Sequence, residues 1–181
     1  MKTTLNEIRK IHLSKASWKK LLRHLGKTEP DDESLPLLTV LESNGLEDTL
    51  FCFRAVDGFD REKRLLAVAF AREVEHLMPD AAKSALEVAE RYANGLATEG
   101  ELTQAYTADY APAADADADN AVAEVAESAA YAYAYAADLY AADRSAADRS
   151  ATVRSAARKT ARSEMQAKQA EILKQFLRDA E

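Results

Sequence analysis

The first 104 residues carry apolar side chains at helical spacing, and glycine or proline separates one apolar run from the next. The first stripe follows Ser17 and ends at Gly26, and this combination of a capping hydroxyl and a closing glycine predicts a helix. Its apolar positions, spaced i, i+3, i+4 and i+7, are Trp18, Leu21, Leu22 and Leu25. Strand-like alternation is confined to Tyr131, Tyr133 and Tyr135, where the intervening alanines favour helix.

Five more helices are predicted from the same signals in this part of the chain. Pro36 suits the first turn of one helix, and Pro79 breaks the chain between two others. Thr98 and Glu101 have the spacing of a capping box, which opens the last of the five. The expected ranges are a helix capped by Ser34 and closed at 44–45, then about 47–56, about 60–77, 80–93, and a helix from 98 onward.

Beyond residue 101 the chain is helix-prone, and Pro112 is its only helix-breaking residue. Of the 38 alanines, 27 follow residue 100. Two or three long helices or one kinked rod fit this pattern. Larger apolar residues return in a stripe that can dock on the rest of the protein: Ile172, Leu173, Phe176 and Leu177. We therefore predict one all-α domain over residues 1–181, a bundle of about six to nine helices. Short helices in 1–104 form the core, and long Ala-rich helices in 105–181 pack on it or extend from it.

Composition narrows the class of protein. The 181 residues are 48% hydrophobic and carry a net charge of −7, which excludes a disordered chain, and the single cysteine excludes a disulfide scaffold. Residues 1–6 lack a signal-peptide core, and the apolar run 65–71 is too short to span a membrane, so a cytoplasmic protein is expected. The charge is segregated: residues 1–30 hold eight basic and two acidic groups, whereas residues 114–140 hold six acidic groups and no basic one. Nucleic acid is a poor partner for a chain this acidic.

Candidate catalytic and metal sites are incomplete in this sequence. The aspartates at 115, 117 and 119 resemble the opening of a calcium loop, but the required glycine and glutamate are replaced by Asn120 and Ala126. Glu73 and His76 form half of a di-iron pair with no second half. Cys52 lies between two phenylalanines without an activating histidine nearby, and the chain has no Gly-rich phosphate loop. We expect no cofactor, no metal and no enzymatic activity.

A pentad repeat begins at residue 141 and suggests two structures. A pentapeptide-repeat β-helix would place Arg144 and Arg149 at inward positions, where unpaired guanidinium groups are costly. On an α-helix the repeat advances by about 140° per pentad, so these arginines spiral around the helix into solvent. A low-complexity helix is the better interpretation.

Tyrosine and aspartate gather in the Ala-rich region and form a candidate partner surface. Tyrosine provides a large contact area at protein interfaces, and the aspartates can steer a basic partner. The alternative is that two or three tyrosines pack on the globular helices. The candidate surface comprises Asp115, Asp117, Asp119, Tyr131, Tyr133 and Tyr135.

An ordered series of short motifs spans about residues 50–104. It includes Val56-Asp57-Gly58, Arg64-Leu65-Leu66-Ala67-Val68, Ala71-Arg72, His76-Leu77 and Ala85-Leu86-Glu87-Val88-Ala89-Glu90-Arg91-Tyr92-Ala93-Asn94-Gly95. The series resembles the all-α immunity-protein family called immunity protein five, found with bacterial polymorphic toxin systems. The resemblance implies a non-enzymatic protein that binds a cognate toxin. Four matching polar positions are expected to tie the fourth helix to the fifth: Arg72, His76, Glu90 and Tyr92.

The leading hypothesis is an immunity protein that neutralises a toxin, for example a nuclease, by stoichiometric association. The alternative is a structural scaffold that self-associates into a homo-oligomer through its Ala-rich helix, because small residues allow helices to approach closely. A helical-bundle enzyme is a third possibility, and the incomplete di-iron pair Glu73 and His76 is the feature that suggests it.

Overall fold

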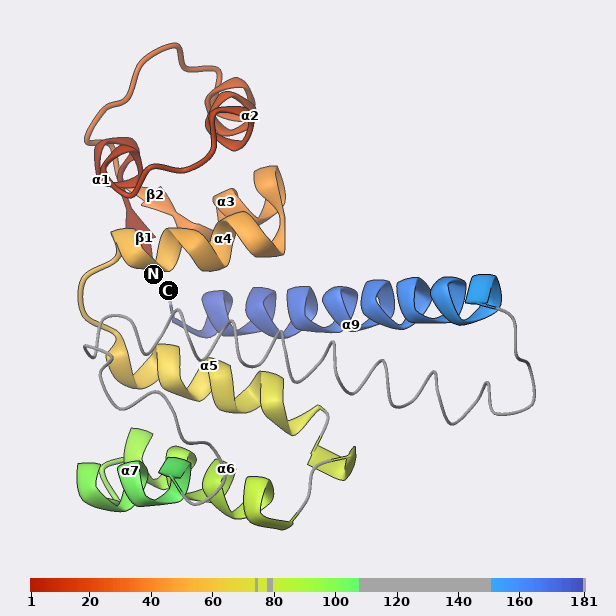
Figure 1. Cartoon of the computed structure of the whole chain (residues 1–181). Helices are drawn as coiled ribbons and strands as arrows, with labels where there is room; N and C mark the ends of the chain where they lie inside the picture. The colour runs from red at the N-terminus through yellow and green to blue at the C-terminus, as the bar shows by residue number, and fades with distance from the viewer. Residues whose placement is uncertain (74, 78–79, 108–150, 181) are drawn as a thin grey trace. The chain divides into compact units, whose positions relative to one another are not determined.

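The computed structural model describes residues 1–73, 75–77, 80–107 and 151–180, and these residues are mostly helical (Figure 1). They form eight α-helices, two short 3-10 helices and one sheet of two two-residue strands, which confirms the predicted all-α class. Backbone contacts divide the chain into two compact units: unit 1 comprises Met1–Phe59 and Gln169–Glu181, and unit 2 comprises Asp60–Lys168. The expectation of a single domain stays a prediction.

Unit 1 contains a small two-stranded antiparallel sheet that sequence patterning did not predict. Lys2 in β1 lies opposite Pro36 in β2, and Thr3 lies opposite Leu35. Strands of two residues are too short to show alternation, so the pairing depends on tertiary contacts. The Thr3 hydroxyl donates to the Ala55 carbonyl at 2.6 Å. The elements of unit 1 are β1 (Lys2–Thr3), α1 (Leu5–Lys10), α2 (Lys15–Leu25), β2 (Leu35–Pro36), α3 (Leu37–Asn44), α4 (Leu46–Cys52), η1 (Phe53–Ala55) and the last residues of α9 (Ala151–Asp179).

The structure corrects two of the predicted helix caps. Ser14 caps α2, because its hydroxyl accepts the Ser17 backbone N–H at 3.1 Å, so Ser17 is a first-turn residue. Gly26 ends α2 in the left-handed conformation, with φ of 66°, as predicted. Ser34 caps no helix, because the next two residues form β2 and α3 starts at Leu37. The helix predicted over 47–56 ends at Cys52 and continues as η1, and the short helix α1 was not predicted.

Leucines from both ends of the chain meet in the core of unit 1. Leu5, Leu21 and Leu37 are fully buried, and so are Leu173 and Leu177 of α9. The amino group of Met1 donates to the Ala180 carbonyl at 3.3 Å, so the two termini lie together in this unit (Figure 1). The docking predicted for the carboxy-terminal stripe is confirmed for Leu173 and Leu177, whereas Ile172 and Phe176 are half-buried.

Asn44 joins three helices of unit 1. Its side-chain amide donates to the Ser17 carbonyl of α2 at 2.9 Å and to the Asp48 carboxylate of α4 at 2.8 Å, while Asn44 itself ends α3. The neighbouring hydroxyl of Ser43 donates to the Asn44 side-chain oxygen at 2.7 Å. A residue predicted only as a helix end therefore also orients the helices around it.

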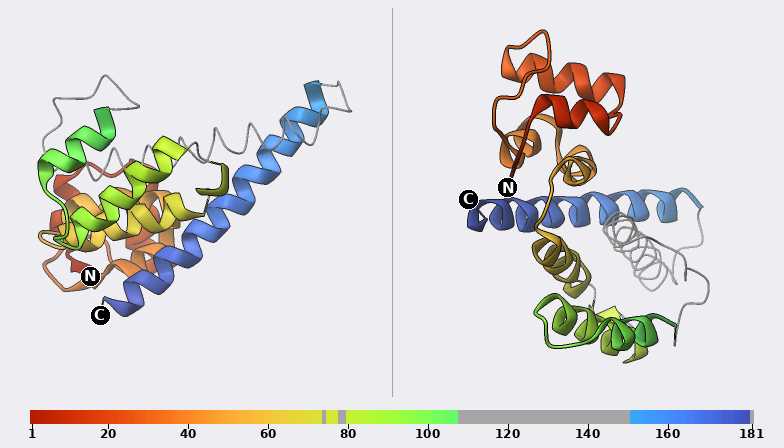
Figure 2. Two further views of the ribbon diagram at one scale, coloured as in Figure 1. Left: turned by 90° about the horizontal axis from the view of Figure 1, so that it is seen from below. Right: turned by 90° about the vertical axis from the view of Figure 1, so that its left-hand side faces the viewer.

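Unit 2 contains α5 (Asp60–Arg72), η2 (Glu75–Leu77), α6 (Asp80–Ala93), α7 (Glu99–Thr107) and the first part of α9. Both views of Figure 2 show α6 next to α7, and α5 also packs on α6. The helix predicted over 60–77 is interrupted, because α5 ends at Arg72 and η2 follows as a separate turn. The helix predicted to begin at Asp80 and end at Ala93 is confirmed. Leu66 and Phe70 of α5 are buried.

The predicted capping box at the start of α7 is confirmed. The Glu101 backbone N–H donates to the Thr98 hydroxyl at 3.2 Å, and the Thr98 backbone N–H donates to the Glu101 carboxylate at 2.7 Å. Both hydrogen bonds satisfy backbone donors that a helix start leaves open.

In the part of the chain that the structure describes, no helix is long and apolar enough to cross a membrane.

Replacing Leu173 by alanine should lower the free energy of unfolding of unit 1 by about 2–5 kcal/mol, because a fully buried leucine leaves a cavity. Trp18, the only tryptophan, lies in α2 of the same unit, so urea denaturation followed by tryptophan fluorescence measures the change. Glu171→Ala, at an exposed position of the same helix, should change the free energy by less than about 0.5 kcal/mol. Equal effects of the two variants would contradict the docking of α9.

Replacing Thr98 by alanine should raise the pKa of Glu101, which the Thr98 backbone and hydroxyl, and secondarily Arg91, hold below its ordinary value. Because the pKa is lowered in the folded state, this contact stabilises the protein above the ordinary pKa of glutamate and is lost as the pH falls through the lowered value. NMR titration of the Glu101 carboxyl carbon measures the shift. An unchanged pKa in Thr98→Ala would show that the Thr98 hydroxyl does not contribute to the shift, because the variant keeps the backbone N–H that contributes most.

Candidate functional site

The four polar residues predicted to tie the fourth helix to the fifth are Arg72, His76, Glu90 and Tyr92. All four lie in unit 2, and the structure brings two of them together. Arg72, the last residue of α5, forms an ion pair with Glu90 of α6. Its second partner is Glu75 of η2, at 2.8 Å. All three side chains are roughly one-third exposed, and the hydrogen bonds from Arg72 to Glu90 and then Glu75 raise the pKa of the guanidinium. Arg72 therefore connects α5, η2 and α6 and stays charged.

The other two residues lie elsewhere. The ring of Tyr92 is covered by the guanidinium of Arg64, whose carbon is 4.7 Å from the ring centre. The His76 side chain is exposed on η2, and no hydrogen bond or ion pair links it to Arg72, Glu90 or Tyr92 among the described residues. The four residues thus do not form one cluster. Tyr92 and Arg72 belong to separate contacts between α5 and α6.

A third contact between these helices involves residues that sequence reasoning missed. Arg61 donates to the side-chain oxygen of Asn94 at 2.7 Å. Arg61, Arg64 and Arg72 project from α5 within about 80° of arc, as expected from 100° per residue. This shared face of three arginines is visible in the sequence, but the groups on α6 that receive them are not. The arrangement aligns α5 with α6, which is a structural role.

The residues predicted to contact a toxin lie outside the described residues. They are Asp115, Asp117, Asp119, Tyr131, Tyr133 and Tyr135, all within the range 108–150. The pentad repeat begins in the same range.

Possible catalytic and metal-binding groups are dispersed in the described part of the chain. Glu73 follows α5 and His76 lies on η2, and the described residues contain no group of three histidine, cysteine or acidic side chains placed to hold a metal ion. Cys52 is fully buried at the end of α4, and burial raises the pKa of its thiol to about 12. A thiol with that pKa is protonated at neutral pH and is a weak nucleophile.

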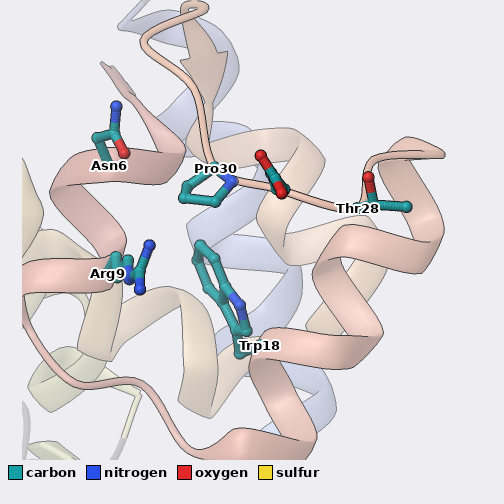
Figure 3. A pocket seen from close by; sticks show the side chains of 6 residues that line it. Asn6, Arg9, Trp18, Thr28 and Pro30 are labelled. Atoms are coloured by element: carbon teal, nitrogen blue, oxygen red, sulfur yellow. The ribbon is translucent and has the colours of Figure 1, made fainter.

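Unit 1 has a surface pocket that the sequence analysis did not predict. Figure 3 shows the indole of Trp18 extending from α2 into it, with Arg9 of α1 across from the ring and Pro30 beside them. The pocket has a volume of about 610 Å³, and Asn6, Thr28 and Glu29 complete its lining. The two helices are predictable from sequence only in part, and the path of the loop over 26–34 that closes the pocket is not. The surplus of basic residues in 1–30 was the sequence feature that indicated a charged surface in this region.

Comparison of the chain with family models, with curated proteins and with solved structures returns no match. The resemblance of residues 50–104 to immunity protein five therefore stays a prediction.

A double-mutant cycle should give a coupling energy of about 0.2–1 kcal/mol between Arg72 and Glu90, because both side chains are partly exposed and solvent screens the pair. The cycle uses Arg72→Ala, Glu90→Ala and the double variant, with urea denaturation followed by circular dichroism. Arg72→Ala together with Lys83→Ala provides a control pair, since Lys83 approaches Asp80 and not Arg72. A coupling near zero would mean that the pair does not tie α5 to α6.

Proposed function

We propose that this chain is a non-enzymatic immunity protein that binds a cognate bacterial toxin and neutralises it stoichiometrically in the cytoplasm. The proposal rests on the ordered motifs over residues 50–104, whose resemblance to immunity protein five points to toxin binding. Stoichiometric neutralisation of a toxin requires a stable protein with an accessible binding surface, and it needs no catalytic centre.

The supporting observation is the position of the motif's polar residues. Arg72 pairs with Glu90, and Arg64 covers Tyr92, so these side chains are engaged between α5 and α6. Polar groups that contact one another in this way keep α5 and α6 aligned. They leave the partner-specific contacts to other residues, which suits a family whose members bind different toxins.

We place the toxin contact on the acidic and aromatic residues at 115, 117, 119, 131, 133 and 135. Residues 114–140 contain six acidic groups and no basic one, so this part of the chain attracts a basic partner such as a nuclease. Tyrosine side chains add contact area at a low cost in conformational entropy.

The proposal is tested by co-expressing the chain with the toxin encoded by the neighbouring gene. Rescue of growth and co-purification in a one-to-one complex are the expected results. Failure of both would reject the immunity function. Light scattering of the purified chain at micromolar concentration tests the alternative, because a stable oligomer that ignores the toxin would instead favour a self-associating scaffold.

Charge reversal of Asp115, Asp117 and Asp119 to lysine should slow association with the toxin by about tenfold at low salt, because steering by complementary charge acts on the association rate. A matched control replaces three exposed glutamates of α6 and α9 by lysine and gives the same net charge: Glu87, Glu164 and Glu171. Stopped-flow kinetics at low and high salt measures both variants. Equal slowing by both would locate the effect in net charge, and unchanged kinetics in the aspartate variant would remove this contact site.

A further inference from the structure

Helix α2 presents a face made of basic residues. Its eleven residues include three lysines, one arginine and one histidine, and no acidic residue. Lys15, Lys19 and Arg23 recur every four residues, so they form a row within about 80° of arc. Leu21, on the opposite side, is fully buried, and the three basic side chains of the row are exposed.

These charges lack carboxylate partners in the part of the chain that the structure describes. The contrast is with Lys27 in the next loop, whose ammonium group approaches Asp31 at 2.6 Å and Glu33 at 2.7 Å. Lys27 lowers the pKa of Asp31, and Asp31 and Glu33 of the loop are thus engaged by Lys27. Among the described residues, the positive face of α2 is therefore available to a partner.

Trp18, which lines the pocket of Figure 3, is the i+3 neighbour of Lys15 in this row. Trp18 lies on α2 about 60° from Lys15 and about 100° from Lys19, and its half-buried indole forms one wall. Pro30 supplies a second apolar surface, while Arg9 and Glu29 bring opposite charges to the same pocket. Exposed tryptophan and arginine side chains are the residue types that most often dominate the energy of protein interfaces.

The mixture of charges identifies the class of ligand. A polypeptide offers carbonyl or carboxylate acceptors for Arg9, amide donors for Glu29 and an apolar body for Trp18. A nucleic-acid backbone offers phosphate acceptors for Arg9 but no amide donor for Glu29. An acidic polypeptide satisfies both the pocket and the basic row.

We propose that the row Lys15, Lys19 and Arg23, together with the Trp18 pocket, binds an acidic polypeptide segment of a partner protein. This surface belongs to unit 1 and is independent of the acidic residues assigned to the toxin contact. The chain therefore has a second interaction surface, of opposite charge.

Trp18 provides the signal for the test, because it is the only tryptophan and lines the pocket. The full-length chain is titrated with a decapeptide of alternating glutamate and glutamine while tryptophan emission is recorded. We expect saturable binding with a Kd below about 100 µM at low salt that weakens as salt is added. A decapeptide of alternating serine and glutamine, which lacks the charge, should bind at least about tenfold more weakly. An absence of binding by the acidic peptide, or equal binding of the two peptides, would overturn the proposal.

Substitutions then locate the binding site. Replacing Lys15, Lys19 and Arg23 by glutamine should weaken binding by at least about tenfold, whereas the same change at Lys83, Lys168 and Arg178 should leave the Kd within about twofold. Both sets remove three positive charges, and circular dichroism establishes that each variant is folded. Arg9→Gln alone should also weaken binding, which keeps the test decisive if the triple variant does not fold. Equal effects of the two triple variants, or tighter binding of hexathymidylate than of the acidic peptide, would overturn the proposal.

Discussion

The burial of Leu173 and Leu177 is the interaction on which the organisation of the described chain depends. Both leucines are fully buried in a unit whose other residues come from positions 1–59. A buried leucine stabilises a fold by about 1.5–3 kcal/mol. The two leucines therefore hold the last residues of α9 in unit 1. The hydrogen bond between the Met1 amino group and the Ala180 carbonyl adds to this closure. In the sequence, residues 60–168 are thus inserted between the two segments that form unit 1.

The two units use their basic residues differently. In unit 2, Arg61, Arg64 and Arg72 are engaged by groups of α6 or η2, and they align helices. In unit 1, the basic row of α2 has no carboxylate partner among the described residues, although acidic side chains are plentiful in the following loop. Paired surface charges contribute little net stability, so their main effect is orientation, whereas open charges are available for recognition. The three arginines of unit 2 therefore have structural roles, whereas the basic row of α2 is suited to an interaction surface.

Signals that act within a few residues predicted the structure well. The glycine that ends α2, the capping box of α7 and the start and end of α6 are all readable, because the relevant hydrogen bonds join residues three or four positions apart. The errors occurred where two local signals compete. Ser14 and Ser17 both precede the apolar stripe of α2, and only the fold decides which hydroxyl caps it. The two-stranded sheet of β1 and β2 has no periodic pattern in the sequence, because each strand has two residues.

The sequence by itself determined the helical class, most helix ends and the segregation of charge, because these follow from local spacing and composition. Only the tertiary structure decided which groups meet. Arg72 contacts Glu90 but neither Tyr92 nor His76, and Asn44 links three helices. Trp18, Arg9 and Pro30 enclose one pocket from two helices and a loop. Such contacts join residues distant in the chain, and their partners are selected by how helices pack, which no local pattern records.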